Sequence, residues 1–456
     1  MRELAAESLS RDPRLDRAKR LLTAALTEQS ETLAGVRPPD PERALAYREL
    51  LDEFGKMRGG ALFYPFLGSG IGNGALVELL DGSVKYDFIT GIGVHGFGHS
   101  HPEVTAVLVD AALSDTIMEG HLQQNLDAVE LSKLLIDASG LDCCFLSSTG
   151  VMANENGLKI AFQAGFPKTR LLAFEKCFMG RTLTVSQITD KPAFRAGLPL
   201  NQPVDYIPFF DEKDPEGSTK RAVQALRQTL DRYPCQHAAM CFELIQGEGG
   251  FRVGSKEFFR TLMTLLKERG ILILADEVQS FGRTSHLFAY QYFELDDLVD
   301  IVTIGKISQA CATLFRKELI PKPGLLAQTF TTSTGAIKAS RWVVEKFQKG
   351  GYLGQEGRNM QIHARFSEHL NRIKEKHPQL IDGPWGIGGM VAFTPYGGDA
   401  ARAQDFAKKL FEAGVMCFTA GQNPTRIRFL PPVLVIKDHE IDEACKILEE
   451  TLISCA

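Results

Sequence analysis

Short apolar strands alternate with helical segments between residues 143 and 305, and this alternation constrains the fold more than any other feature of the sequence. Five runs rich in β-branched and other apolar residues predict buried strands: CCFLSS, LLAF, AAMCFELI, GILILADE and VDIVTIG. Alternation of this kind is typical of a parallel or mostly parallel sheet with helices on both faces. We therefore predict an α/β fold whose functional site lies at the carboxyl ends of the strands.

The two ends of the chain have a different pattern. Helices are expected over residues 14–34 and near 43–56, and ALVELLDGSVKYDFIT predicts two strands joined by an Asp-Gly turn. After about residue 345, a long charged helix is followed by GIGGMVAFTP, a further helix and TRIRFLPPVLV, which predicts a smaller α+β domain. The predicted division is an N-terminal extension with the first part of the small domain (1–95), a large domain (96–345) and the C-terminal small domain (346–456).

The composition argues against several classes of protein. The chain has 456 residues, 44% of them hydrophobic, and a net charge of −5, so it is long enough for a large core and its mild acidity predicts neither a nucleic-acid nor a membrane partner. No apolar run reaches the roughly 20 residues of a membrane helix, and the charged N-terminus lacks the apolar region of a secretory signal. The nine cysteines contain no CxxC pair. We therefore expect a reduced, cytoplasmic protein.

Polar residues stand at the ends of several predicted strands, where strand packing alone does not require them. They are Lys306 after VDIVTIG, Asp276 at the end of GILILAD with Gln279 just beyond it, and Glu243 at the end of AAMCFE with Glu248 in the following Gly-rich turn. Carboxyl ends of neighbouring parallel strands meet at one edge of a sheet, so these side chains are expected to form one site. A lysine in apolar surroundings has a lowered pKa and becomes a nucleophilic amine, which forms a Schiff base with a carbonyl compound.

Other residues predict the partner of this lysine. The turn SSTG, which ends at Gly150, opens a helix whose first N–H groups suit a phosphate, and Phe178 offers a ring for stacking. An aspartate such as Asp276 keeps a pyridinium nitrogen protonated in enzymes that use pyridoxal 5'-phosphate (PLP). Taken singly, such a turn is commonly a helix cap, such an aspartate a turn residue and such a lysine a solvated side chain. Their joint occurrence predicts a PLP site.

Six segments resemble the class III (ω-amino acid) aminotransferases of PLP fold type I. In chain order they are SSTGVMANENGLKIAF, FMGRTL, FELIQGEGG, LADEVQSFGRT, IVTIGK and RIRFLPP, and the resemblance runs from about residue 75 to the C-terminus. It implies a large domain with a mostly parallel seven-stranded sheet flanked by helices, and a smaller α+β domain. It also implies bound PLP and a homodimer with the active site at the subunit interface.

The resemblance assigns roles by position in these segments. Lys306 would bind the cofactor aldehyde and carry a proton, and Asp276 would pair with the ring nitrogen. The remaining cofactor contacts would come from Gly150, Val151, Phe178, Glu243, Val278, Gln279 and Thr329, the last of which would reach the cofactor of the neighbouring subunit. The substrate would be bound by Arg181 and Arg428, two carboxylate-binding arginines, with Glu248 pairing with Arg428 in the first half-reaction. No metal is expected, because His99 and His101 form an HxH pair without further ligands at suitable spacing.

The substrate prediction is mixed. NENGLKIAF, FAYQYF and GKISQAC are similar to lysine 6-aminotransferases, whereas DFITGIGVHGFGHSHPEV resembles acetylornithine aminotransferase, and Ile92 replaces a tyrosine of the ornithine enzymes. The chain departs from the family at Leu244, where proline is usual, and at TFTTST, where the family has TFGGNP. We expect transfer of the terminal amino group of a diamino acid, L-lysine, to 2-oxoglutarate by a ping-pong route.

Three alternatives to this function stay open. One is an acetylornithine or 4-aminobutyrate type of aminotransferase, and another is a PLP aminomutase or racemase on the same scaffold. A third is a binding or structural homologue that kept only the fold. The expected Glu248–Arg428 pair favours a transferase, because an aminomutase has no need to switch between two substrates. Retention of Lys306, Asp276 and Gln279 together argues against a protein that has lost its chemistry.

Overall fold

The predicted strands form one seven-stranded sheet in the computed structural model, which describes residues 2–456. Its strands, in spatial order, are β5 (Cys143–Ser147), β13 (Cys311–Phe315), β12 (Ile301–Ile304), β11 (Leu272–Glu277), β8 (His237–Phe242), β6 (Arg170–Phe174) and β7 (Val204–Ile207). Neighbouring strands are parallel except around β13, which runs antiparallel to both β12 and β5. The mostly parallel sheet is confirmed, although the sequence analysis did not identify the short strands β7 and β13.

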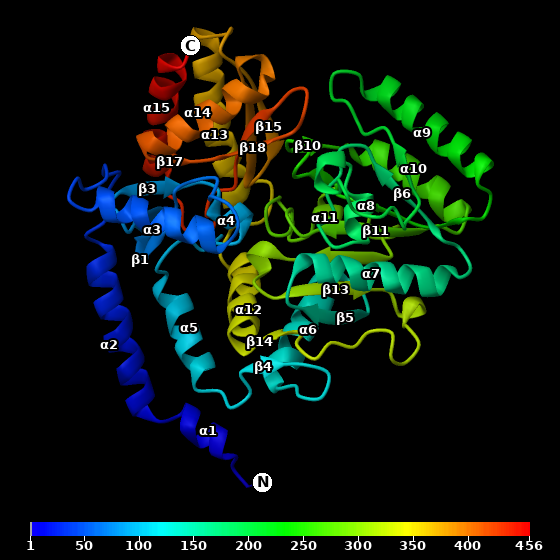
Figure 1. Cartoon of the computed structure of the whole chain (residues 1–456). Coiled ribbons are helices and arrows are strands. Elements are labelled where there is room, and N and C mark those ends of the chain that lie inside the picture. Colours follow the sequence, from blue (N-terminus) through cyan, green and yellow to red (C-terminus); the bar gives the residue numbers. More distant parts are fainter. Residues whose placement is uncertain (1) are drawn as a thin grey trace.

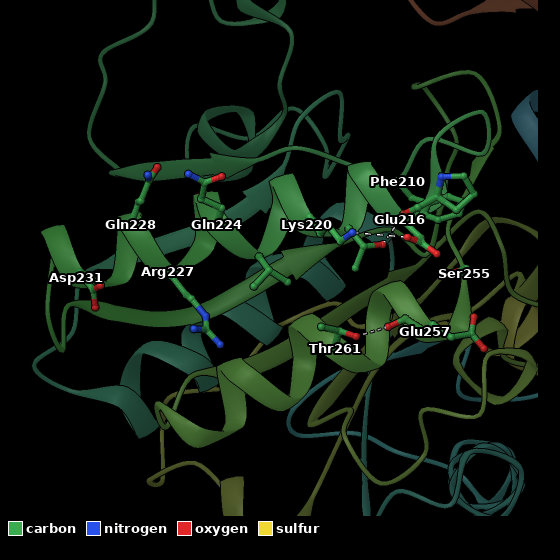
Figure 2. Close-up of a pocket in the computed structure, with 13 residues that line it drawn as sticks. Phe210, Glu216, Lys220, Gln224, Arg227, Gln228, Asp231, Ser255, Glu257 and Thr261 are labelled. Atoms are coloured by element: carbon green, nitrogen blue, oxygen red, sulfur yellow. Dashed lines mark hydrogen bonds and ion pairs between the residues drawn. The ribbon is translucent and has the colours of Figure 1, made fainter.

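Helices cover both faces of this sheet (Figure 1). The helix α7 (Gly150–Gly165) packs on one face, and α6 (Leu126–Ser139), α9 (Pro215–Arg232) and α10 (Lys256–Glu268) pack on the other. Alternate residues of β6 point to opposite sides, because Leu171 contributes to the core under α7 and Leu172 to the core under α10. Figure 2 shows α9 and α10 side by side, with Arg227 and Thr261 bordering the groove between them.

The N-terminal segment contributes to a second sheet together with the C-terminal part of the chain. Helices α2 (Pro13–Ser30) and α3 (Ala44–Met57) confirm the two expected helices, and β2 (Leu76–Leu79) and β3 (Val84–Asp87) confirm the expected antiparallel pair. In this sheet β1 (Gly68–Asn73) flanks β2, while β17 (Val415–Met416) pairs in parallel with β3. The N-terminal segment is therefore joined to residues more than three hundred positions away, although the predicted domain boundaries stay predictions.

The C-terminal region is an antiparallel sheet with helices packed against it, in agreement with the α+β arrangement predicted after about residue 345. Its strands, in spatial order, are β15 (Ile381–Ile387), β16 (Met390–Pro395), β19 (Arg426–Phe429) and β18 (Phe418–Ala420). Its helices are α13 (Arg358–Lys376), α14 (Ala400–Ala413) and α15 (Asp438–Ser454). Figure 1 shows this region beside the large sheet, which places β15 and β18 next to the loops at the sheet edge.

The remaining elements are short or connect these regions. They are α1 (Ala5–Ser10), α4 (Thr90–Gly93), α5 (Pro102–Ala112), β4 (Met118–Glu119), α8 (Val185–Ile188), η1 (Pro192–Phe194), β9 (Ile245–Gln246), β10 (Arg252–Val253), α11 (Ala289–Tyr292), η2 (Lys306–Ser308), η3 (Lys317–Leu319), β14 (Thr332–Ser333), α12 (Thr334–Lys349) and η4 (Tyr396–Gly398). None of the helices described within residues 2–456 combines the length and the apolar character needed to cross a bilayer.

Candidate active site

One cavity of about 330 Å³ at the carboxyl edge of the large sheet collects the predicted site residues. Every one of them lines it except Arg428, which lies directly behind Glu248, and Thr329. The residues that line it are Gly150, Val151, Asn154, Phe178, Met179, Gly180, Arg181, Glu243, Glu248, Asp276, Val278, Gln279 and Lys306. Residues separated by more than 150 positions therefore share one small volume, as the strand-end argument predicted.

Asp276 is a buried carboxylate held in one orientation. It lies near the end of β11, where its Oδ1 accepts the N–H of Val278 at 2.9 Å and its Oδ2 accepts the Nδ2 of Asn154 at 2.7 Å. The Asn154 amide is itself oriented by the Thr303 hydroxyl, which donates to its Oδ1 at 2.6 Å. Burial raises the pKa of Asp276 to about 6, although these two hydrogen bonds oppose the shift. The carboxylate is thus rigidly aimed and favours a cationic partner.

Lys306 follows β12, the strand next to the one that carries Asp276, and lines the same cavity. It begins η2 with a φ of 55°, in the left-handed region that a residue with a side chain seldom adopts. Burial and then the Arg428 guanidinium lower the pKa of Lys306 to about 8. The amine is therefore far closer to its neutral, nucleophilic form than a solvated lysine, as expected from its position after an apolar strand.

The first turn of α7 forms the other wall of the cavity. The Thr149 hydroxyl caps the helix by accepting the N–H of Met152 at 3.2 Å, so the capping group engages neither Gly150 nor Val151. The first N–H groups of a helix have no intrahelical acceptor, and they suit an anion. Gly150 packs so closely on Val278 that a Cβ at this position would lie 2.6 Å from the valine Cγ1. Any larger residue would displace Val278 from the cavity wall.

Glu243 ties the loop that carries Phe178 to the Gly-rich turn. Its Oε2 accepts the N–H of Phe178 and its Oε1 accepts the N–H of Gly247, each at 2.8 Å. Burial, and then the nearby Asp276 charge, raise the pKa of Glu243 to about 8. The carboxyl group accordingly positions two walls of the cavity.

Glu248 and Arg428 form an ion pair at the end of the cavity. Arg428 is fully buried, and its Nη1 also lies 3.4 Å from Oε1 of Gln279. Burial alone would raise the pKa of Glu248, but the Arg428 guanidinium holds it below the usual value. The Nε of Arg428 is buried and, within residues 2–456, has no hydrogen-bond acceptor. The pair therefore leaves one donor of the arginine for another group.

Two further cationic side chains, Arg181 and Lys191, belong to this site. The guanidinium of Arg181 stacks on the ring of Phe194, 3.6 Å from its centroid, and the ammonium of Lys191 lies 4.7 Å from the same centroid. Lys191 also approaches Oε2 of Glu248 at 3.6 Å. Arg181 itself forms no ion pair with another described residue. A substrate carboxylate could thus be bound by either of two arginines, Arg181 or Arg428.

Thr329 is the predicted residue that this arrangement does not bring together with the others. It lies in the loop before β14, outside the cavity, where a Cβ added to Gly120 would lie 2.0 Å from the Thr329 carbonyl oxygen. Its expected contact is with the cofactor of a neighbouring subunit, and this contact stays a prediction.

Two polar residues of the site were missed in the sequence analysis. Asn154 lies one helical turn beyond Gly150 on the cavity-facing side of α7, and this i, i+4 spacing could have identified it. Lys191 reaches Glu248 from a loop after α8, and no spacing in the sequence indicates that contact. No metal-binding cluster of three or more such side chains is found in the described part of the chain, and His99 pairs instead with the buried Asp87 at 3.0 Å.

The residues present fit a flat aromatic cofactor that carries a phosphate and an aldehyde. The tight Gly150 turn offers backbone N–H groups for the phosphate, Phe178 and Val278 line the space for a ring, and a buried carboxylate and a lysine of lowered pKa occupy the same cavity. An aromatic cation beside Asp276 would remove the cost of its buried charge.

Comparison with known proteins points in the same direction. A family profile described as aminotransferase class-III matches residues 69–452. An acetylornithine aminotransferase of Methanocaldococcus jannaschii is 30% identical over 396 residues, which covers 83% of this chain and 92% of that protein. The acetylornithine aminotransferase of Archaeoglobus fulgidus is 29% identical, over 83% of this chain and 93% of that protein.

Solved structures show the same fold. Lysine aminotransferase from M. tuberculosis has a TM-score of 0.78 and 24% identity, and the match covers 89% of this chain and 100% of that chain. Ornithine aminotransferase from Toxoplasma gondii ME49 has a TM-score of 0.76 and 25% identity, with 90% and 97% covered.

Proposed function

The chain belongs to the class III aminotransferases, a family of PLP-dependent transferases of fold type I, and from that membership we propose that it moves the terminal amino group of L-lysine to 2-oxoglutarate. The observation that carries the proposal is the Glu248–Arg428 pair beside Lys306, together with Arg181, which lines the same cavity and has no carboxylate partner among the described residues. Such a site accepts first a long amine and then a dicarboxylic oxo acid.

The chain's own groups would hold the cofactor at defined points. PLP, when bound, supplies an aldehyde that takes up an amino group and a ring that withdraws electrons from the neighbouring carbon. The N–H groups of Gly150 and Val151 would hold its phosphate, and Asp276 would hold a proton at the ring nitrogen. Phe178 and Val278 would line the two faces of the ring, with Gln279 beside them.

Lys306 would act as the acid and base of the reaction. With a pKa of about 8, roughly a tenth of its Nζ is neutral at pH 7, a far larger fraction than for a solvated lysine. It would take a proton from the substrate carbon that carries the amino group and deliver it to the cofactor carbon that receives this amino group. The Lys306 side chain lines the same cavity as Asp276 and Gln279.

The two substrates would be distinguished by a carboxylate switch. While lysine is bound, Glu248 would neutralise Arg428, and the lysine carboxylate would bind Arg181 so that the distal amine lies beside Lys306, where the cofactor aldehyde would be held. When 2-oxoglutarate enters, its carboxylate would displace Glu248 from Arg428 and engage the free Nε as well. Lys191, already 3.6 Å from Glu248, would then neutralise the released carboxylate.

A half-reaction screen tests the proposal. The PLP form of the protein is mixed separately with lysine, ornithine, N-acetylornithine, 4-aminobutyrate and putrescine, and loss of the visible absorption band is followed. We expect the fastest loss with lysine, and recovery of the band on addition of 2-oxoglutarate. A fast loss of the band with N-acetylornithine and no loss with lysine would show that N-acetylornithine is the amino donor and lysine is not.

The second candidate is an N-acetylornithine aminotransferase. The curated relatives of this chain that bear that name, two of them described above, support it as well as the structural neighbours support lysine. Both donors present a terminal amine and an α-carboxylate, so both are compatible with the Arg181 and Arg428 positions. The donor that causes the faster loss of the band in the same screen is the one that the protein prefers.

A further inference from the structure

A second cavity of about 310 Å³ lies on the other side of the Gly-rich turn that carries Glu248. It is bounded by the large domain region on one side and by the C-terminal sheet on the other. Among the residues that line it are Lys176, Phe210, Asp211, Glu212, Lys213, Gly249, Arg252, Asp382, Trp385 and Arg426. Within the turn, Glu248 lines the first cavity and Gly249 lines the second, so a single turn of backbone separates them.

Four cationic side chains line this second cavity, and none of them forms an ion pair within 4.0 Å with a described carboxylate. Arg252 donates to the carbonyl oxygen of Phe210 at 3.2 Å, and Arg426 donates to that of Gly250 at 2.8 Å. Lys176 lies 3.4 Å from the carbonyl oxygen of Gln422. These contacts use only part of the donor capacity of two guanidinium groups and an ammonium group.

The three carboxylates of the cavity act on these cations only at longer range, without forming an ion pair. Asp211 and Glu212 oppose the lowering of the Arg252 pKa, and Glu212 and Asp382 oppose that of the Arg426 pKa. Asp382 is paired with Lys374 at 2.7 Å, and Oδ1 of Asp211 accepts the N–H of Lys213 at 3.0 Å. Glu212 is exposed to solvent. The cavity therefore has four cationic side chains against three carboxylates, of which Asp382 is already paired with Lys374.

Partial burial makes the positive charges of this cavity energetically costly. It lowers the pKa of Arg426 to about 10 and also lowers the pKa of Arg252. Burial, and then the Arg252 charge, lower the pKa of Lys176. Charged groups retained in such a place are normally paired, so an external anion would complete the arrangement.

We propose that this cavity binds a small oxyanion, a phosphate monoester or a dicarboxylate, between the guanidinium groups of Arg252 and Arg426 and the ammonium of Lys176. Paired guanidinium forks match the oxygen geometry of both ligand types. The site is separate from the cavity of Lys306, so its ligand is not a substrate of the transfer reaction. Because Gly421 donates its N–H to the Glu248 carbonyl at 2.9 Å and Arg426 holds Gly250, the ligand also contacts the supports of the Glu248 turn.

The chain contains a reporter for this site. Trp385 is one of only two tryptophans, and its ring centroid lies 4.4 Å from the Arg426 guanidinium. The other, Trp342, lies on α12, where its Nε1 donates to Glu103 at 2.9 Å. The substitution Trp342→Phe in the PLP-loaded protein therefore isolates the emission of Trp385.

The experiment titrates this protein with inorganic phosphate, glycerol 3-phosphate and succinate, with sodium chloride holding the ionic strength constant. We expect a saturable change of Trp385 emission with at least one of them. A response to both phosphates alone identifies a phosphate ligand, a response to succinate alone identifies a dicarboxylate, and no saturable response to any of the three overturns the proposal.

Variants locate the binding. The double substitution Arg252→Gln and Arg426→Gln is expected to raise the Kd at least tenfold, measured by the same titration and by calorimetry. The single substitution Lys213→Gln, at an exposed side chain, is expected to raise it about threefold and serves if the double variant does not fold. The matched control is Lys220→Gln on α9, a cation in the groove of Figure 2, which should leave the Kd unchanged. Equal Kd values in all of these proteins would overturn the proposal.

Discussion

The two cavities on either side of residues 247–250 are similar in volume, about 330 and 310 Å³, but differ in how their charges are balanced. In the first, the fully buried Arg428 faces Glu248, and Lys306 shares the cavity with Asp276. In the second, Arg252 and Arg426 have no such partner among the described residues. A paired arrangement can exchange its own carboxylate for that of a substrate, whereas an unpaired one requires a ligand from outside.

Volume alone does not identify a site in this molecule. The groove between α9 and α10 in Figure 2 is larger, about 760 Å³, yet none of the predicted site residues borders it. Its charged side chains lie at the surface, as the exposed Lys220–Glu216 pair at 3.6 Å illustrates. Charge placed where water is scarce is therefore the better guide to chemistry here.

The largest expected effect comes from removing the amine of the first cavity, the side chain of Lys306. We expect Lys306→Ala to lower kcat by about 10³–10⁴-fold or more, because the substitution removes both the aldehyde-binding group and the acid–base group. Steady-state kinetics with the best donor of the screen would measure it. Unchanged thermal unfolding of the variant is the control, and activity within tenfold of the unsubstituted protein would contradict the assignment.

Removing the opposing carboxylate comes next. Asp276→Asn keeps the size of the side chain but loses the negative charge, so we expect kcat to fall about 10²–10³-fold. The visible band of the bound cofactor should shift at the same time, since its ring nitrogen would lose the group that holds its proton. Asn154→Ala, which removes only one hydrogen bond to Asp276, should have a smaller effect on the same readouts.

The contrast between paired and unpaired arginines can be measured as stability. Arg428→Gln removes the nearer cation beside the largely buried Glu248 and leaves only Lys191, at 3.6 Å, so we expect it to lower the free energy of unfolding by about 3 kcal/mol. Arg426→Gln removes a cation that has no carboxylate partner, so the change should stay within about 1 kcal/mol in a buffer without oxyanions. Denaturant unfolding of both variants gives the comparison, and equal losses would show that the two cavities do not differ in this respect.

The smallest expected effect is the pH dependence of cofactor uptake. Below its pKa of about 8, Lys306 is a cation and does not attack an aldehyde; above it, the amine is neutral. Uptake of PLP by the cofactor-free protein should therefore accelerate about tenfold between about pH 7 and pH 9 and then level off. The reaction of PLP with a solvated lysine derivative is the reference, and it should keep accelerating well above that range.

Much of the site was predictable because strand ends are a local property. Lys306, Asp276 and Glu243 each follow a run of apolar residues, and parallel strands bring such ends to one edge whatever their distance along the chain. The short strands β7 and β13 were not identified, since VDYI carries a charged residue within its apolar run and CATLF shows no alternation that distinguishes a strand from a helical segment.

The sequence by itself determined the class of fold, the cofactor chemistry and most of the residues at the sheet edge. Hydrophobic periodicity and the polar residues at strand ends can both be recognised from residues that are close together in the chain. Only the tertiary structure decided that Lys191 stands beside Glu248, that Asn154 orients Asp276, and that Arg252 and Arg426 share a cavity. Charges interact through space and depend on burial, and neither quantity is a property of a residue's neighbours in the chain.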